Sequence, residues 1–83
     1  MAQPEQKLIW RCRRGVRELD VLLTRFLEQD YAGLTAAERA GFDKFLEQQD
    51  PVIMDWLFGR SSAERADVQA IVERLQNLSG LRD

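Results

Sequence analysis

The sequence predicts an all-α protein, a compact five-helix bundle that forms a single domain over residues 1–83. Apolar residues recur with the 3.6-residue period of a helix, and no stretch alternates with period two for the length of a strand. The segments that join the periodic stretches are short, as they are in helical bundles. A chain of this size forms one core, close to the lower limit for an independently stable domain.

The first two predicted helices flank a glycine. Residues 5–14 predict a short basic amphipathic helix, because Leu8, Ile9 and Cys12 share one helical face. Gly15 interrupts this helix, and a second one begins directly after it. The apolar face of the second helix keeps the helical period and consists of Val16, Leu19, Leu22, Leu23, Phe26 and Leu27.

A turn at residues 31–34 precedes the third helix, which we expect over residues 36–49. The sequence Thr35-Ala-Ala-Glu38 has the form of a capping box, in which the two side chains satisfy free backbone amides at a helix start. The predicted core side of this helix consists of Phe42, Phe45 and Leu46, with Ala40 or Gly41 at the edge where a neighbour approaches closely.

Two more helices complete the bundle. Asp50 is a good N-cap and Pro51 is tolerated at the first helical position, which predicts a short fourth helix over residues 51–58. Gly59 suits the left-handed conformation that ends a helix, and Ser61-Ser62-Ala63-Glu64 offers the cap of the fifth. The residues expected to face inward are Val52, Ile53, Trp56 and Leu57, then Val68, Ile71, Val72, Leu75 and Leu78.

The composition excludes much catalytic chemistry. The chain has no histidine and one cysteine, so the usual zinc sites, the Ser-His-Asp triad and the Cys-His pair are unavailable. The glycines stand singly, without the spacing of a phosphate-binding loop. Cys12 cannot form an internal disulfide and is predicted to be a small buried hydrophobe. We therefore expect a protein without a metal site or a dinucleotide site of its own.

Charge and hydropathy favour a protein partner in the cytoplasm. No stretch approaches the ~20 apolar residues of a membrane span, and the start lacks the apolar segment of a signal peptide. Residues 1–17 carry five cationic side chains and one acidic one, so this basic end is a candidate binding surface. The sequence pI of about 5.1 argues against nucleic acid as the main partner.

The segment Trp10–Asp20 contains four arginines, one glycine and two acids. It resembles the succinate dehydrogenase FAD assembly factors, whose R-G-x-x-E signature is present as Arg14-Gly15-Val16-Arg17-Glu18. One departure is Phe45, where that family more often has Leu. Similar residues follow in the family's order at Phe26-Leu-Glu-Gln-Asp-Tyr31, Phe42-Asp-Lys-Phe-Leu-Glu47, Asp50 and Asp55-Trp56-Leu57.

The resemblance implies a five-helix domain that binds the flavoprotein subunit of succinate dehydrogenase, or of the related fumarate reductase, and we expect this domain to be a monomer. It implies that the domain promotes covalent attachment of FAD, and that the nucleophilic histidine belongs to the partner. Such a factor holds the reacting groups together and is not itself an enzyme. It acts on the FAD of its partner and binds no cofactor stably.

The resemblance places the partner-binding face at Arg14, Gly15 and Glu18. Gly15 serves either by its lack of Cβ, through close approach or a positive φ, or as an ordinary helix-ending glycine. Arg14 and Glu18 either contact the partner or form a solvated i,i+4 pair.

The residues around the motif also have two interpretations each. The three arginines Arg11, Arg13 and Arg17 either bind partner carboxylates or flavin phosphates, or are simply solvated. Trp10 is either a partner-facing anchor or a cover for the core, whereas Trp56 is expected in the core. The acids Asp20 and Asp55 are expected to cap or pair with arginines inside the domain.

Two alternatives to the assembly role come from different classes. The first is a regulatory protein of the antitoxin or nucleic-acid-binding type, which would use the basic first helix and bind DNA with a strong salt dependence. The second is catalytic, with Glu18 as an acid or base in flavin transfer.

Overall fold

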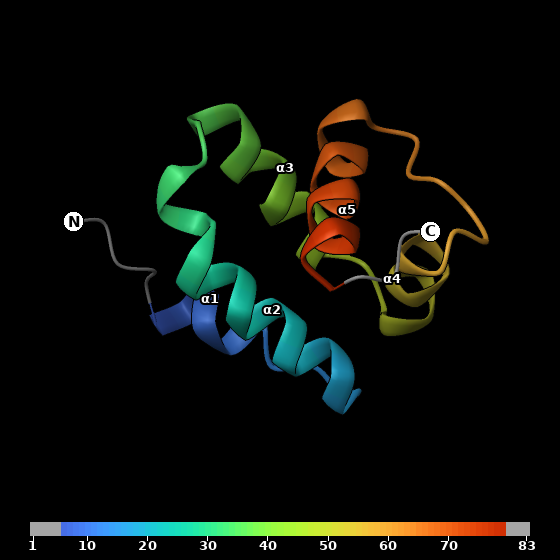
Figure 1. Ribbon diagram of the computed structural model, residues 1–83, viewed down its shortest axis with the longest axis horizontal. Helices are drawn as coiled ribbons and strands as arrows, with labels where there is room; N and C mark the ends of the chain where they lie inside the picture. Colours follow the sequence, from blue (N-terminus) through green and yellow to red (C-terminus); the bar gives the residue numbers. More distant parts are fainter. Residues whose placement is uncertain (1–5, 80–83) are drawn as a thin grey trace.

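The computed structural model describes residues 6–79, and within them all regular secondary structure is helical, without a strand. The all-α, five-helix prediction is confirmed for this part of the chain (Figure 1). The elements are α1 (Gln6–Arg11), α2 (Arg17–Gln29), the 3-10 helix η1 (Tyr31–Gly33), α3 (Ala36–Leu46), α4 (Asp50–Leu57) and α5 (Ala66–Ser79).

The core is assembled around α5, which packs against α2, α3 and α4. The rings of Phe26 and Phe42 lie 4.9 Å apart between their centroids, and the ring of Phe45 lies 6.1 Å from that of Phe42. The apolar face predicted for the second helix is confirmed, because Leu19, Leu22, Leu23, Phe26 and Leu27 are all buried. Figure 1 shows α1 and the connection from α4 to α5 at opposite ends of the long dimension.

The predicted capping box opens α3. The Thr35 amide donates to Oε1 of Glu38 at 2.8 Å, and the Glu38 amide donates to Oγ1 of Thr35 at 3.1 Å. Glu38 also accepts from the Arg74 guanidinium of α5 at 2.7 Å. The Thr35 amide, followed by Arg74, lowers the pKa of the Glu38 carboxyl. The cap therefore also ties α3 to α5.

A glycine allows α3 and α5 to approach closely. Gly41 is buried, and a Cβ added there would lie 2.6 Å from the backbone oxygen of Asp67. The predicted close approach is confirmed at Gly41, whereas Ala40 is exposed.

Several helix boundaries differ from the predicted ones. The first helix ends at Arg11 instead of residue 14, and the third ends at Leu46 instead of residue 49. The N-cap of α4 is Gln49, and Asp50 is already helical. The Asp50 carboxylate was expected to cap its own helix, but it accepts hydrogen bonds from the segment between α1 and α2 instead.

For the region from α4 to α5, two predictions are wrong and one is confirmed. Val52 was expected to face inward but is 37% exposed, because α4 turns Ile53 and Leu57 into the core and leaves Val52 on its outer side. The fifth helix begins at Ala66, so Ser61–Glu64 is not its cap. Gly59 adopts a φ of +76°, as predicted for the residue that ends α4.

Candidate functional site

Arg14 is partly buried, and its guanidinium binds groups of its own chain. Its Nε donates to Oδ1 of Asp50 at 2.7 Å, and Nη1 donates to the carbonyl oxygen of Leu46 at 3.0 Å. Nη2 donates to the carbonyl oxygen of Gln48. Leu46 is the last residue of α3, so the guanidinium caps carbonyl groups that the helix end leaves free. The side chain of Arg14 is only 14% exposed.

Two carboxylates hold the backbone of the segment between α1 and α2. The Arg14 amide donates to Oδ1 of Asp20, and the Gly15 amide donates to Oδ2 of Asp50 at 3.2 Å. Consecutive amides are therefore bound by acids from two different helices, α2 and α4. The expectation that Asp20 acts inside the domain is confirmed, and Asp55 likewise pairs with Arg60.

The fold does not need a glycine at position 15. Gly15 is exposed, and an added Cβ would lie 3.6 Å from Oδ2 of Asp50, an ordinary van der Waals contact. Among the described residues only Gly59 has a positive φ, so the positive-φ explanation for Gly15 is wrong. The helix-ending explanation is also wrong, because α1 already ends at Arg11. What remains of the predicted roles is access for a second molecule.

Glu18 forms no ion pair with Arg14 in the described part of the chain. Arg14 points toward Asp50, so the solvated i,i+4 pair, one of the two interpretations of these residues, is wrong. Glu18 is exposed in the first turn of α2, where the helix dipole favours a negative charge. It takes part in no ion pair among residues 6–79.

The arginines of this region divide into two kinds. Arg11 donates to both the carboxylate and the backbone oxygen of Asp43, the latter at 2.9 Å. Arg11 and Arg14 thus bind acids of their own chain. Arg13 and Arg17 are exposed and form no ion pair in the described part of the chain. These two remain available to other molecules.

The two tryptophans differ in exposure. Trp10 is 68% exposed, so it does not cover the core. Its neighbour Ile9 is 42% exposed, although it was expected on the apolar face of the first helix. Trp56 packs against the core as predicted, with its ring centroid 6.0 Å from that of Phe45. An aromatic side chain with an apolar neighbour is therefore presented on α1.

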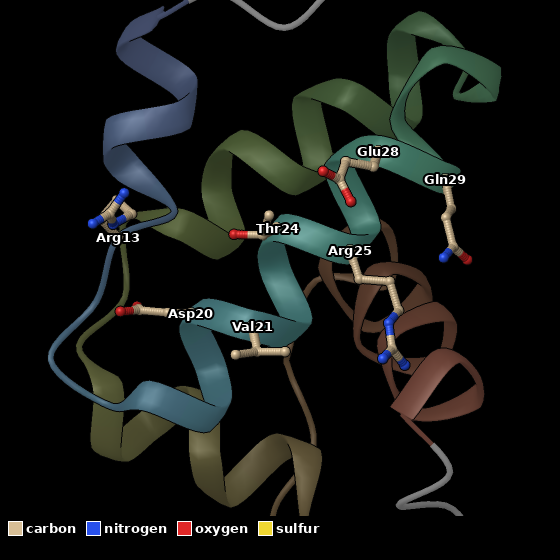
Figure 2. A pocket seen from close by; sticks show the side chains of 7 residues that line it. All are labelled: Arg13, Asp20, Val21, Thr24, Arg25, Glu28 and Gln29. Atoms are coloured by element: carbon tan, nitrogen blue, oxygen red, sulfur yellow. The ribbon is translucent and has the colours of Figure 1, made fainter.

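Arg13 faces α2 across an open groove of about 400 Å³ (Figure 2). The apolar side chain of Val21, which is 55% exposed, lies in this groove among polar neighbours. Figure 2 shows the lining side chains, which are Arg13, Asp20, Val21, Thr24, Arg25, Glu28 and Gln29. Sequence patterns did not reveal this groove, because Arg13 lies outside the helices and the other lining residues lie on the largely polar side of α2.

Cys12 is buried, as predicted, at 1% exposure. Burial raises the pKa of its thiol from 9.0 to about 11, against the opposing effect of the nearby arginines. The thiol is therefore neutral at physiological pH, which makes it a poor nucleophile.

The high pKa of Cys12 predicts a loss of stability in alkali. The pKa of the Cys12 thiol is higher in the folded state than in the unfolded state. The stability that depends on this thiol is therefore complete below pH 9 and is lost as pH rises toward 11. The free energy of unfolding should fall by about 1.4 kcal/mol for each pH unit in this window, beyond the fall seen in Cys12→Ala. Urea unfolding at several pH values measures this difference, and parallel curves for both proteins would contradict it.

The described chain offers no group of three or more His, Cys, Asp or Glu residues that could hold a metal ion. No helix within residues 6–79 is long and apolar enough to cross a membrane.

The fold and this surface define a class: small all-helical proteins with an exposed tryptophan, glycine and charged side chains at the junction of two helices. Residues 6–79 match the model of a protein family described as flavinator of succinate dehydrogenase. This chain belongs to that family, which confirms the resemblance inferred from the R-G-x-x-E motif.

Curated relatives cover most of the chain. The FAD assembly factor SdhE of Coxiella burnetii is 42% identical over 74 residues, which span 89% of this chain and 90% of the relative. The FAD assembly factor SdhE of Vibrio cholerae is 35% identical over 83 residues, 98% of this chain and 96% of the relative. The protein of the same name from Pseudomonas aeruginosa is 40% identical over 70 residues, 84% and 83% of the two chains.

Proposed function

We propose that this chain binds the flavoprotein subunit of succinate dehydrogenase, or of fumarate reductase, and promotes covalent attachment of FAD. It acts as a monomer in the cytoplasm, and it contributes no catalytic group. The family and the names of the relatives support this assignment. The chain has no histidine, so a histidine that forms the bond to flavin belongs to the partner.

The observation that carries the proposal is the division of the R-G-x-x-E motif into an inner and an outer part. Arg14 is bound within the fold, whereas Gly15 and Glu18 are exposed. We define the docking face as Trp10, Gly15, Arg17 and Glu18. Trp10 supplies a large aromatic side chain of the kind enriched at interface hot spots. Gly15 permits a close approach, and the two charged residues provide polar contacts.

Arg11 and Arg14, which the sequence suggested as partner-binding residues, both bind acids of their own chain, and of the two only Arg14 is largely shielded from solvent. Their donors are already bound to Asp43 and Asp50. Releasing Arg14 for a partner would break its ion pair and uncap the end of α3. The proposed mechanism is positional: the docked domain holds the FAD-binding region of the partner in a geometry that brings flavin and histidine together.

In-gel flavin fluorescence tests the proposal. The flavoprotein subunit is expressed in a host that lacks its own factor, with this chain supplied or withheld. We expect covalent flavin only when the chain is supplied. Fluorescence that is indifferent to it would contradict the proposal and favour the nucleic-acid-binding alternative.

Gly15→Arg is expected to weaken docking at least about tenfold, a loss of about 1.4 kcal/mol of docking free energy, and thereby to lower the flavinylated fraction. The change is compatible with the fold, since the Cβ position makes only an ordinary contact. The thermal midpoint should therefore stay close to that of the wild type.

Gly33→Arg is the matched control for this substitution. Gly33 is also exposed, and no atom lies within 4 Å of an added Cβ. It lies in η1, away from the docking face. Equal flavinylation by folded Gly15→Arg and Gly33→Arg proteins would remove Gly15 from the docking face.

A further inference from the structure

The Asp50 carboxylate connects two parts of the chain that are far apart in sequence. Oδ1 accepts from Nε of Arg14 at 2.7 Å, across 36 positions. Oδ2 accepts from the Gly15 amide at 3.2 Å, across 35 positions. Both oxygens are thus used on adjacent residues of the R-G-x-x-E motif, and the side chain is only 25% exposed.

Cys12 is buried in the core and the Arg14 guanidinium also binds the carbonyl oxygens of Leu46 and Gln48, whereas the exposed backbone amide of Gly15 is held by Asp50. The residues between α1 and α2 form no regular secondary structure. The amides of Arg14 and Gly15 donate to side-chain carboxylates instead of backbone oxygens. Asp20 belongs to α2, so its bond fixes Arg14 relative to that helix. Asp50 belongs to α4, so its bonds fix the segment relative to the rest of the domain.

We infer that Asp50 is a positioning residue for the docking face, an inference that rests on the proposed function. Asp50 holds the exposed backbone of Gly15 in one place relative to Glu18 and does not itself touch the partner. A surface that is ordered before binding loses less conformational freedom on docking, so the carboxylate strengthens binding through preorganisation.

Two substitutions separate this role from a purely stabilising one. Asp50→Asn has nearly the same shape but only one accepting oxygen, so either Arg14 or Gly15 loses its acceptor. Asp50→Glu retains the negative charge that pairs with Arg14, and it displaces the carboxylate by one methylene from the Gly15 amide. The matched control is Asp55→Asn, which removes a carboxylate of the same helix that pairs with the exposed Arg60.

The test measures the Kd of each purified variant for the purified flavoprotein subunit, at a temperature where circular dichroism shows the variant to be folded. We expect Asp50→Asn to weaken binding about tenfold, Asp50→Glu about fivefold, and Asp55→Asn less than about twofold. Amide hydrogen exchange of Gly15 supplies a readout without the partner. It should accelerate in both Asp50 variants and stay unchanged in Asp55→Asn.

Wild-type affinity in both Asp50 variants would overturn the inference, as would an unchanged exchange rate at Gly15. If Asp50→Asn does not fold, the Kd values and Gly15 exchange rates of Asp50→Glu and Asp55→Asn are compared instead. Equal values for these two variants would likewise overturn the inference. Failure of the wild-type chain itself to bind the flavoprotein subunit would instead refute the proposed function. The two failures are therefore distinct.

Discussion

Gly41→Ala is expected to lower the free energy of unfolding by about 2 to 3 kcal/mol, because the added methyl group overpacks the contact between α3 and α5. The Cβ would lie 2.6 Å from the backbone oxygen of Asp67 and 3.0 Å from its carbonyl carbon. Both are backbone atoms, so a helix must move to admit the methyl group. Alanine also gains about 1 kcal/mol of helix propensity over glycine, which the clash must exceed.

Urea unfolding followed by circular dichroism measures this loss, and Gly33→Ala is the control. An added Cβ at Gly33 meets nothing within 4 Å, so its stability should stay within about 0.5 kcal/mol of the wild type. If Gly41→Ala proved as stable as the wild type, helix propensity would outweigh the clash, and the α3–α5 contact would be more compliant than its geometry indicates.

Arg14→Ala is expected to cost about 2 to 3 kcal/mol of stability. Removing one partner of a buried pair costs about 3 to 5 kcal/mol, and this pair is discounted because Asp50 retains some solvent contact. The substitution also leaves the carbonyl oxygens of Leu46 and Gln48 without their donor. Chemical unfolding measures the loss, and Arg14→Lys should recover only part of it, since lysine lacks the planar fork of donors.

Arg13→Ala is the matched control, one residue away and exposed, with an expected change below about 0.5 kcal/mol. The comparison also separates the two roles suggested for Arg14. Loss of stability together with loss of flavinylation fits a residue that supports the docking face from within. If Arg14→Ala were as stable as Arg13→Ala but failed to dock, the guanidinium would contact the partner directly.

Much of the fold could be predicted because periodicity records which side of a helix is buried. The five buried residues of α2 and the capping box of α3 follow from local patterns alone. The N-cap of α4 could not be predicted in this way. The local preference of an Asp-Pro pair competes with Arg14 and Gly15, which are distant in sequence, and the tertiary contacts prevail.

The sequence predicted which residues form the candidate site, but not how these residues are arranged in space. The i,i+4 rule that suggested an Arg14–Glu18 pair holds only within one continuous helix. Here α1 ends at Arg11 and α2 begins at Arg17, so the spacing has no geometric meaning across the gap. The motif alone also could not show that Arg14 points inward, because that depends on the positions of Leu46, Gln48 and Asp50.

The guanidinium of Arg14 joins the junction of α1 and α2 to the end of α3 and the start of α4. The R-G-x-x-E sequence therefore does not have this structure when it is taken out of the domain. A fragment that ends before Leu46 contains the whole R-G-x-x-E sequence. It lacks the acceptors at Leu46, Gln48 and Asp50 that hold Arg14 in place. Contacts over more than 30 positions require the acceptors near Asp50 to be present, and closing so long a loop makes them slow to form. If the chain docks as proposed, its docking face is complete only after synthesis has passed Asp50 at the start of α4.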